Sequence, residues 1–205
     1  MTERISFQGE LGANSHIACQ QAYPHLTPLP CPTFEDAFAA VSEGQARYAM
    51  IPIENSVFGR VADVHHLLPD SGLFIAGERF TPIRHQLLGV RGASLAGLKK
   101  VRSHPQALGQ CRRLLRDLGV EAVKAADTAG AAREIAELGD PSVGALASAL
   151  AGQVYGLDVL MADIADAAHN TTRFLVLSRE PEDAEPDAGP CMTSFLFRVR
   201  NVPAA

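Results

Sequence analysis

KKVRSHPQALGQCRRLLRDLGVEAVK, residues 99–124, is the stretch of sequence that decides the fold. It predicts a strand at Lys100–Arg102, a helix over Pro105–Leu118 that ends at Gly119, and a second strand at Val120–Lys124. Short apolar runs that alternate with helical periods are the signature of α/β packing. The stretch therefore predicts an α/β fold.

The same alternation extends in both directions from this stretch. Toward the N-terminus we expect strands at Arg4–Phe7, near His25–Leu29 and at Tyr48–Ile53, helices at Ser15–Ala22, Thr33–Ser42 and Arg60–Leu68, and an extended segment at Leu73–Val90. Toward the C-terminus we expect a helix at Thr128–Leu138, a strand at Ser142–Ala145, a short helix at Ser148–Tyr155 and a late strand at Arg173–Leu177. Thr33 is expected to cap its helix, with Asp36 three residues on.

A late strand of this kind returns to a sheet formed earlier in the chain. We therefore expect two lobes of mixed sheet flanked by helices, joined by crossing strands, with a ligand cleft between them. The first lobe is expected to comprise residues 1–77 and 165–178, and the second residues 78–164. Together they form one domain over residues 1–178.

The composition excludes several classes of protein. The chain has 205 residues, a net charge of -5 from 18 basic and 23 acidic residues, and a mean hydropathy of +0.04. Scattered basic residues argue against nucleic acid as a partner, and no apolar run approaches the roughly 20 residues that cross a bilayer. The first dozen residues lack a secretory h-region, so we expect a cytoplasmic protein without membrane contact.

The four cysteines are Cys19, Cys31, Cys111 and Cys191, and no two of them form a CxxC pair. We expect reduced, mostly buried thiols. No histidine, cysteine and carboxylate spacing typical of a metal site stands out, so no metal is expected.

Polar residues interrupt the pattern at four places where α/β folds present ligand groups. The first, FQGELGANSH at residues 7–16, is a glycine-spaced loop before a helix whose backbone amides could hold a carboxylate. Its glycines could equally be turn residues with Ser15 as an N-cap. The second, IPIENS at residues 51–56, ends a hydrophobic strand in an acid, an amide and a hydroxyl, which is also the composition of an ordinary turn.

The other two polar stretches lie in the second half of the chain. SHPQALGQ at residues 103–110 places Ser103 and His104 before a helix, with Gln106 and Gln110 on one helical face. Ser103 could instead cap that helix. HNTTRF at residues 169–174 precedes the returning strand, and its threonines could simply begin that strand.

Taken together, the four stretches resemble the prephenate dehydratase family, in which they occur in the same order. The resemblance covers about residues 4–178, and IPIENSVFGRV with the TRF ending is specific as a set. The opening departs from the family, whose members usually show GPxGT followed by an aromatic residue and Ser. Known members fold as two α/β lobes like type 2 periplasmic binding proteins, convert prephenate to phenylpyruvate, and need no cofactor.

The resemblance also implies roles for individual residues. It implies catalytic roles for Thr172, Glu54, Asn55, Ser103, His104 and Gln110. With the polar stretches it suggests substrate contacts from Arg173, Thr171, Asn170, Ser15 and Ser56. We expect Thr172 to donate a hydrogen bond to the departing hydroxyl, Arg173 to anchor a carboxylate bidentately, and Asn55 and Gln110 to add neutral donors. His104 is expected to be either a carboxylate partner or a structural group.

The C-terminal segment differs in composition from the rest. REPEDAEPDAGP at residues 179–190 is expected to be a linker. Residues 191–205 contain an alternating strand pattern at Met192–Arg200 and resemble the first strand of an ACT regulatory domain. Phenylalanine is expected as an effector only with a complete ACT domain. The unpaired edge and the family suggest a homodimer or homotetramer.

Two other functions are compatible with the same sequence. An arogenate dehydratase would differ only in the amine of its substrate, and a non-catalytic two-lobed module would bind a small ligand without converting it. Turnover of prephenate and arogenate, measured side by side, would separate the three.

Overall fold

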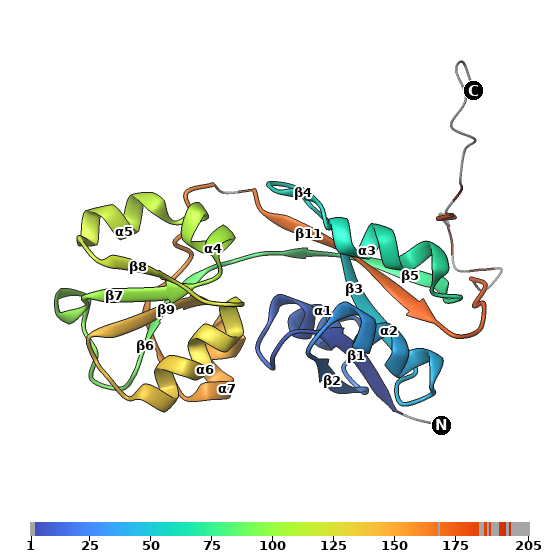
Figure 1. The fold of residues 1–205 in the computed structure, drawn as a ribbon, viewed down its shortest axis with the longest axis horizontal. Helices are drawn as coiled ribbons and strands as arrows, with labels where there is room; N and C mark the ends of the chain where they lie inside the picture. The colour runs from blue at the N-terminus through green and yellow to red at the C-terminus, as the bar shows by residue number, and fades with distance from the viewer. Residues whose placement is uncertain are drawn as a thin grey trace, which may run out of the picture.

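The strands of the protein form two separate mixed sheets, one in each lobe (Figure 1). This computed structural model describes residues 3–167, 169–184, 187, 189, 193–195 and 197. The first sheet has the order β2-β1-β3-β11-β5, with β4 paired to β3. Its strands are β1 (Arg4–Gln8), β2 (Thr27–Cys31), β3 (Tyr48–Asn55), β4 (Gly59–Arg60), β5 (Phe74–Pro82) and β11 (Thr171–Ser178).

The second sheet has the order β10-β6-β9-β7-β8. Its strands are β6 (Gln86–Gly89), β7 (Lys100–Ser103), β8 (Glu121–Lys124), β9 (Val143–Ala147) and β10 (Asp158–Met161). β7 runs parallel to β8 and β9, whereas β6 runs antiparallel to β9 and β10. The prediction of two lobes of mixed sheet flanked by helices is therefore confirmed.

The chain crosses between the lobes twice. It leaves the first lobe after β5 and returns to it in β11, which lies between β3 and β5 and is antiparallel to both. The returning strand is thus an inner strand of the first sheet, with both of its edges hydrogen-bonded to neighbouring strands. Side chains of β11 alternate between the two faces, as in any strand.

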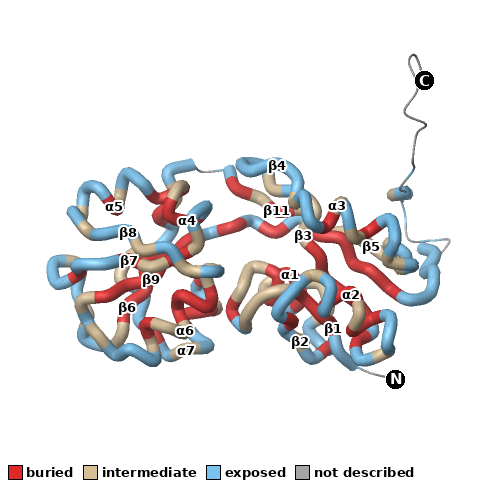
Figure 2. Tube along the Cα trace, viewed as in Figure 1, coloured by how far each residue is buried: buried red, intermediate tan, exposed pale blue. Residues whose placement is uncertain are grey.

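The first lobe has one apolar core on each face of its sheet. Helices α2 (Phe34–Ser42) and α3 (Ala62–Leu67) and the 3-10 turn η1 (Leu68–Asp70) cover the face that holds Leu175 and Leu177. Helix α1 (Asn14–Ala22) covers the face that holds Phe174 and Val176. Figure 2 shows the buried trace running through these strands.

The second lobe repeats this three-layer arrangement. Helices α6 (Thr128–Leu138) and α7 (Ala149–Tyr155) cover one face of the second sheet, and α4 (Pro105–Gln110) and α5 (Arg112–Leu118) cover the other. A 3-10 turn, η2 (Leu95–Gly97), precedes β7. The helix caps follow the sequence closely: Thr33 and Asp36 form the expected capping box, and Gly139 ends α6 in the left-handed conformation.

One predicted helix is wrong as a single element. The stretch 105–118 breaks at Cys111, which adopts a non-helical conformation between α4 and α5. The second crossing segment explains the break, because the Asp166 backbone N–H donates to the Gln110 carbonyl and the Asp166 carboxylate accepts from the Arg113 N–H at 3.3 Å. A tertiary contact of this kind overrides local helical periodicity.

Other differences concern the ends of elements. The helix expected from Arg60 begins at Ala62, because Gly59 and Arg60 pair with β3. Strand β10 was not expected, and β2 lies two residues further along the chain than the predicted strand. The strands with which these segments pair fix the boundaries, and those strands are distant in sequence.

Several expectations concern parts of the chain outside the sheets. Cys19, Cys31 and Cys111 are free and buried, as expected, whereas Cys191 is outside the described residues. Most of the predicted strand at 192–200 is also outside them. In the linker, the Glu182 carboxylate accepts from the Tyr48 hydroxyl at 2.8 Å. None of the helices among the described residues combines the length and apolar character needed to cross a bilayer.

Candidate active site

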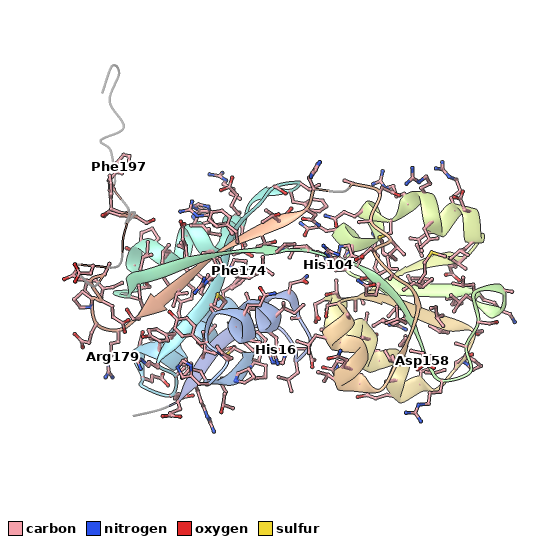
Figure 3. The ribbon with its side chains drawn as sticks, turned by 180° about the vertical axis from the view of Figure 1, so that it is seen from behind. His16, His104, Asp158, Phe174, Arg179 and Phe197 are labelled. Carbon is pink, nitrogen blue, oxygen red and sulfur yellow. The ribbon has the colours of Figure 1, made fainter. Side chains whose placement is uncertain are left out.

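A cavity of about 430 Å³ lies between the two lobes, where sequence analysis placed the cleft. The first lobe contributes the loop after β1, the start of α1, the ends of β3 and β11, and the start of α3. The second lobe contributes the starts of α4 and α6. In Figure 3, Phe174 marks the first lobe and His104 the second, and both side chains line this cavity.

Thr172 and Asn55 meet on the cavity wall because their strands are neighbours. The register of β11 and β3 pairs these two residues, so their side chains lie on the same face of the sheet. The Asn55 Nδ2 donates to the Thr172 Oγ1 at 2.9 Å. The Asn55 Oδ1 accepts from the backbone N–H groups of Val57 at 2.9 Å and Phe58 at 3.1 Å, which fixes the orientation of the amide.

The hydrogen bonds continue from Asn55 into the second lobe. Its Nδ2 also donates to the Asn170 Oδ1 at 2.7 Å, and the Asn170 Nδ2 donates to the Gln110 Oε1 at 2.8 Å. The same Gln110 oxygen lies 2.7 Å from the Nε2 of His85. We call the five residues His85, Gln110, Asn170, Asn55 and Thr172 the amide relay.

Four members of the amide relay were predicted as site residues, and the structure brings them together at the cavity. Asn55 differs from its expected role, because both of its N–H groups are occupied by Asn170 and Thr172. The Gln110 Nε2 has no partner among the described residues and remains a neutral donor. His85 was missed by sequence analysis, since a single histidine in an extended segment gives no local signal.

Ser15 and His104 also line the cavity. Ser15 lies inside the first turn of α1, whose N-cap is Ala13 without a side-chain cap, so the alternative of Ser15 as N-cap is wrong. The first N–H groups of α1 at Asn14 and Ser15 therefore lack the capping group that usually satisfies them. His104 is the N-cap of α4, and its Nδ1 accepts from the Gln106 N–H at 3.3 Å.

Arg173 does not line the cavity. It follows Thr172 on a strand, so its side chain lies on the opposite face of the sheet. Its guanidinium bonds Glu78 on β5 twice, at 2.8 Å from Nε and 2.7 Å from Nη2. This placement does not support the expected bidentate contact with a substrate carboxylate. Glu54 pairs with Arg173 in the strand register, is exposed, and also lies outside the cavity.

Three further predicted residues have structural hydrogen bonds away from the cavity. Ser103 is fully buried and its Oγ donates to the Leu146 carbonyl at 2.6 Å. The Ser56 Oγ donates to the His169 carbonyl at 3.3 Å and accepts from the Thr171 N–H at 3.0 Å. These contacts hold the strand that carries Ser103 and the ends of β3 and β11 in place.

The glycine-spaced loop after β1 contacts the second lobe. The Ser148 Oγ donates to the Gly12 carbonyl at 2.6 Å, and the Tyr155 hydroxyl donates to the Leu11 carbonyl at 2.9 Å. A Cβ at Gly12 would lie 2.6 Å from the Ala151 Cα, and the φ of Gly12 is +88°. The loop thus closes one side of the cavity at a distance that only glycine permits.

The backbone N–H groups of both glycines in this loop have partners inside the protein. Gly9 donates to the Cys31 carbonyl, and Gly12 donates to the His16 Nδ1 at 3.0 Å. The N–H groups of these glycines are therefore not available to a carboxylate, in contrast to the expectation for this stretch.

The ionisable side chains of the cavity lining are few. They are Asp63, Asp127, His85 and His104, and the lining contains neither lysine nor arginine. Asp127 caps α6 by accepting from the Gly130 N–H at 2.7 Å. Burial lowers the pKa of His85 below the usual histidine value, because the charged ring would lose its hydration. Within the described part of the chain, no group of three or more His, Cys, Asp or Glu residues could hold a metal ion.

Comparisons with known proteins agree with the resemblance noted in the sequence. The family model described as "Prephenate dehydratase" matches residues 5–182. A "Bifunctional N-acyl-homoserine lactone acylase/prephenate dehydratase" from Komagataeibacter europaeus is 48% identical over 201 residues, which are 98% of this chain and 72% of that protein. "Arogenate dehydratase/prephenate dehydratase 1, chloroplastic" from Arabidopsis thaliana is 44% identical over 98% of this chain and 51% of its own length.

Solved structures show the same fold. The structure of a prephenate dehydratase from Arthrobacter aurescens in complex with L-Phe superposes with a TM-score of 0.82 at 30% identity. The match covers 89% of this chain and 62% of that one. The chain thus spans about half the length of the plant relatives that it matches.

Proposed function

Because this chain belongs to the prephenate dehydratase family, we propose that its inter-lobe cavity converts prephenate to phenylpyruvate with loss of carbon dioxide and water. The observation that carries the proposal is the Thr172 hydroxyl at the cavity wall, oriented by Asn55 over 2.9 Å. A fixed hydroxyl in a largely buried site is the kind of preorganised donor that stabilises a departing oxygen.

The direction of the Asn55 bond decides what Thr172 can do. Since the Asn55 N–H donates to the Thr172 oxygen, the hydroxyl hydrogen of Thr172 is left for another acceptor. Among the described residues no such acceptor is hydrogen-bonded to it. We propose that this hydrogen points at the ring hydroxyl of the substrate and stabilises it as it leaves.

The reaction needs orientation more than an electron sink. The bond to the ring carboxylate breaks, its electron pair enters the ring, and the C–O bond breaks as the leaving hydroxide takes up one proton from solvent, so that carbon dioxide and water form. Aromatisation of the ring drives both cleavages. The protein then contributes by holding the dianion with the leaving hydroxyl beside Thr172.

Neutral groups and a helix N-terminus would hold that dianion. The uncapped first turn of α1 at Asn14 and Ser15 offers backbone N–H groups to a carboxylate, and the Gln110 Nε2 offers another donor. His104 lines the cavity, where it can meet a carboxylate. In this proposal Arg173 supports the strand and does not touch substrate.

The acylase activity in the name of the Komagataeibacter relative belongs to that protein. Acyl transfer by a nucleophile usually needs a hydroxyl or thiol hydrogen-bonded to a base. Among the described residues no Ser, Thr or Cys side chain is hydrogen-bonded to a histidine side chain. The proposal is therefore restricted to the dehydratase reaction.

The test is direct turnover. The purified chain is incubated with prephenate and, in parallel, with arogenate, and phenylpyruvate and phenylalanine are measured. Formation of phenylpyruvate at a clearly higher kcat/KM than that for phenylalanine supports the proposal. Binding of prephenate without conversion would indicate a non-catalytic module, and preferential conversion of arogenate would reassign the substrate.

The remaining expectations stay proposals. We propose that residues 1–178 are the catalytic domain, 179–190 a linker and 191–205 the first strand of an ACT domain. L-Phe in the Arthrobacter structure belongs to a chain of which this one covers 62%. Phenylalanine as an effector only where a complete ACT domain is present, a homodimer or homotetramer, and a cytoplasmic location are likewise proposed from the family and composition alone.

A further inference from the structure

The geometry points to His85 as a positioning residue, which selects the amide orientation of Gln110 and thereby supports, through Asn170 and Asn55, the hydrogen-bond order at the Thr172 hydroxyl. This inference rests on the proposed function, because it assigns His85 to the reaction that Thr172 serves. His85 itself lies at the far end of the amide relay from Thr172.

The direction of every bond in the amide relay follows from the backbone. The N–H groups of Val57 and Phe58 can only donate, so the Asn55 atom that they contact must be its oxygen. The Asn55 nitrogen then donates to the Asn170 oxygen, and the Asn170 nitrogen donates to Gln110. The Gln110 atom at the end of this chain must therefore be an acceptor.

This order fixes the tautomer of His85. An amide oxygen accepts hydrogen bonds and does not donate them, so the Nε2 of His85 at 2.7 Å from it must carry a hydrogen. Burial holds the ring neutral by lowering its pKa, which leaves Nδ1 as the unprotonated nitrogen. His85 thus enters the amide relay as a donor.

Two donors on one oxygen select the orientation of the Gln110 amide. In the observed orientation the Gln110 oxygen accepts from both Asn170 and His85. If the amide turned over, its NH₂ group would face two N–H donors in a buried site, which is unfavourable. Without the His85 donor, only the Asn170 N–H would oppose that turn. A reversed Gln110 would disturb the sequence of donors and acceptors that leads through Asn170 and Asn55 to Thr172.

His85 is itself held where the two crossing segments meet. Its carbonyl accepts from the Ile164 N–H at 3.0 Å, the residue is 4% exposed, and it lines the cavity. The neighbouring Ile83 N–H donates to the Asn170 carbonyl at 2.8 Å. Both crossing segments therefore keep the imidazole in register with Gln110 of the second lobe and Asn170 beside the first.

Two substitutions at position 85 distinguish the effect of losing the N–H donor from the effect of changing the volume of the side chain. His85→Leu removes the donor, and we expect kcat to fall about 10- to 100-fold, with KM changed less than about 3-fold. His85→Gln can return an N–H to the place of Nε2, and we expect it to recover kcat to within roughly 5-fold of wild type. His66→Leu, on an exposed face of α3 outside the cavity, is the matched control.

A spectroscopic readout tests the same inference without turnover. In ¹⁵N NMR of the labelled full chain, the His85 ring should show a protonated Nε2 and an unprotonated Nδ1 at neutral pH. Gln110→Leu should abolish the preference for this tautomer. This signature would persist even if wild-type protein failed to convert prephenate, so failure of the proposed function can be told apart from failure of the inference.

Three results would overturn the role of His85. They are a folded His85→Leu variant with kcat within about 3-fold of wild type, a folded His85→Gln variant as impaired as His85→Leu, and a wild-type ring protonated at Nδ1 and not at Nε2. Thermal unfolding of each variant establishes that it is folded at the assay temperature.

Discussion

Asn55 donates its side-chain N–H to the Thr172 oxygen over 2.9 Å, although 117 positions separate the two residues in the chain. The bond leaves the Thr172 hydrogen available to another acceptor, which in the proposed function is the leaving group, so Thr172→Ala should lower kcat roughly 10²- to 10³-fold, as loss of one positioned transition-state donor does elsewhere. Steady-state turnover of prephenate measures this effect.

The matched control for Thr172→Ala is its neighbour. Thr171 lies outside the cavity, and the hydrogen bonds of its backbone survive substitution by alanine. Thr171→Ala should therefore keep kcat within about 3-fold of wild type. Comparable losses in both variants would mean that the strand end, and not the Thr172 hydroxyl, matters for turnover.

Arg173 should matter for stability more than for binding. Its ion pair with Glu78 is partly buried, with side chains 30% and 20% exposed, so Arg173→Leu should lower the free energy of unfolding by about 1–3 kcal/mol. The KM for prephenate should stay within about 3-fold of wild type at a temperature where the variant is folded. Glu78→Gln is the matched variant, and a large rise in KM specific to Arg173→Leu would show that the guanidinium reaches the substrate.

Gly12→Ala should loosen the contact between the lobes. The added Cβ would lie 2.6 Å from the Ala151 Cα, so the loop must move away from α7, at a cost of roughly 1–3 kcal/mol. We expect a higher KM and a larger radius of gyration in small-angle scattering. Gly92→Ala is the control that distinguishes the steric clash from backbone strain. Gly92 has a similar φ of +83°, so alanine there is strained, but nothing lies within 4 Å of its Cβ position, so alanine there meets no clash. Equal behaviour of the two variants would contradict the contact.

Protonation of His16, which contacts the Gly12 loop, should lower the free energy of unfolding. Burial lowers the pKa of His16, and its Nδ1 accepts from the Gly12 N–H. The unfolded chain therefore takes up this proton more readily than the folded one, so stability present above the unfolded pKa of roughly 6.5 is lost as the pH falls below it. One such group changes the free energy of unfolding by at most about 1.4 kcal/mol per pH unit.

Denaturant unfolding between pH 7.5 and pH 5 measures that change. His16→Asn places an amide oxygen near the position of Nδ1 without a titrating ring, and its stability should fall less steeply toward acid than that of wild type. His25→Asn, at an exposed position, is the control. If the stability of His16→Asn falls toward acid pH as steeply as that of wild type, His16 is not the source of the pH dependence.

Much of the fold could be predicted because its signals are local. The capping box of Thr33 and Asp36, the left-handed glycine after α6 and the apolar run of β11 each depend on a few consecutive residues. The break of the predicted helix at Cys111 could not be predicted, because it depends on Asp166 more than fifty residues away.

The site was predictable in its residue types but not in its geometry. Asn55, Gln110, Asn170 and Thr172 stand at the ends of elements, as expected of ligand groups, and they meet in one network. The sequence could not tell that Thr172 faces the cavity while Arg173, the next residue, faces the other side of the sheet. It also gave no sign that His85 would complete the network.

By itself the sequence determined most of the helices and strands in their order, the division into two lobes and the polar stretches that border the cleft, because backbone preferences act between near neighbours. Only the tertiary structure decided which face each polar side chain occupies, where α4 ends, and that His85 orients Gln110. Those outcomes depend on strand register and on hydrogen bonds between residues 25 to 117 positions apart, which form only when segments distant in sequence pack together.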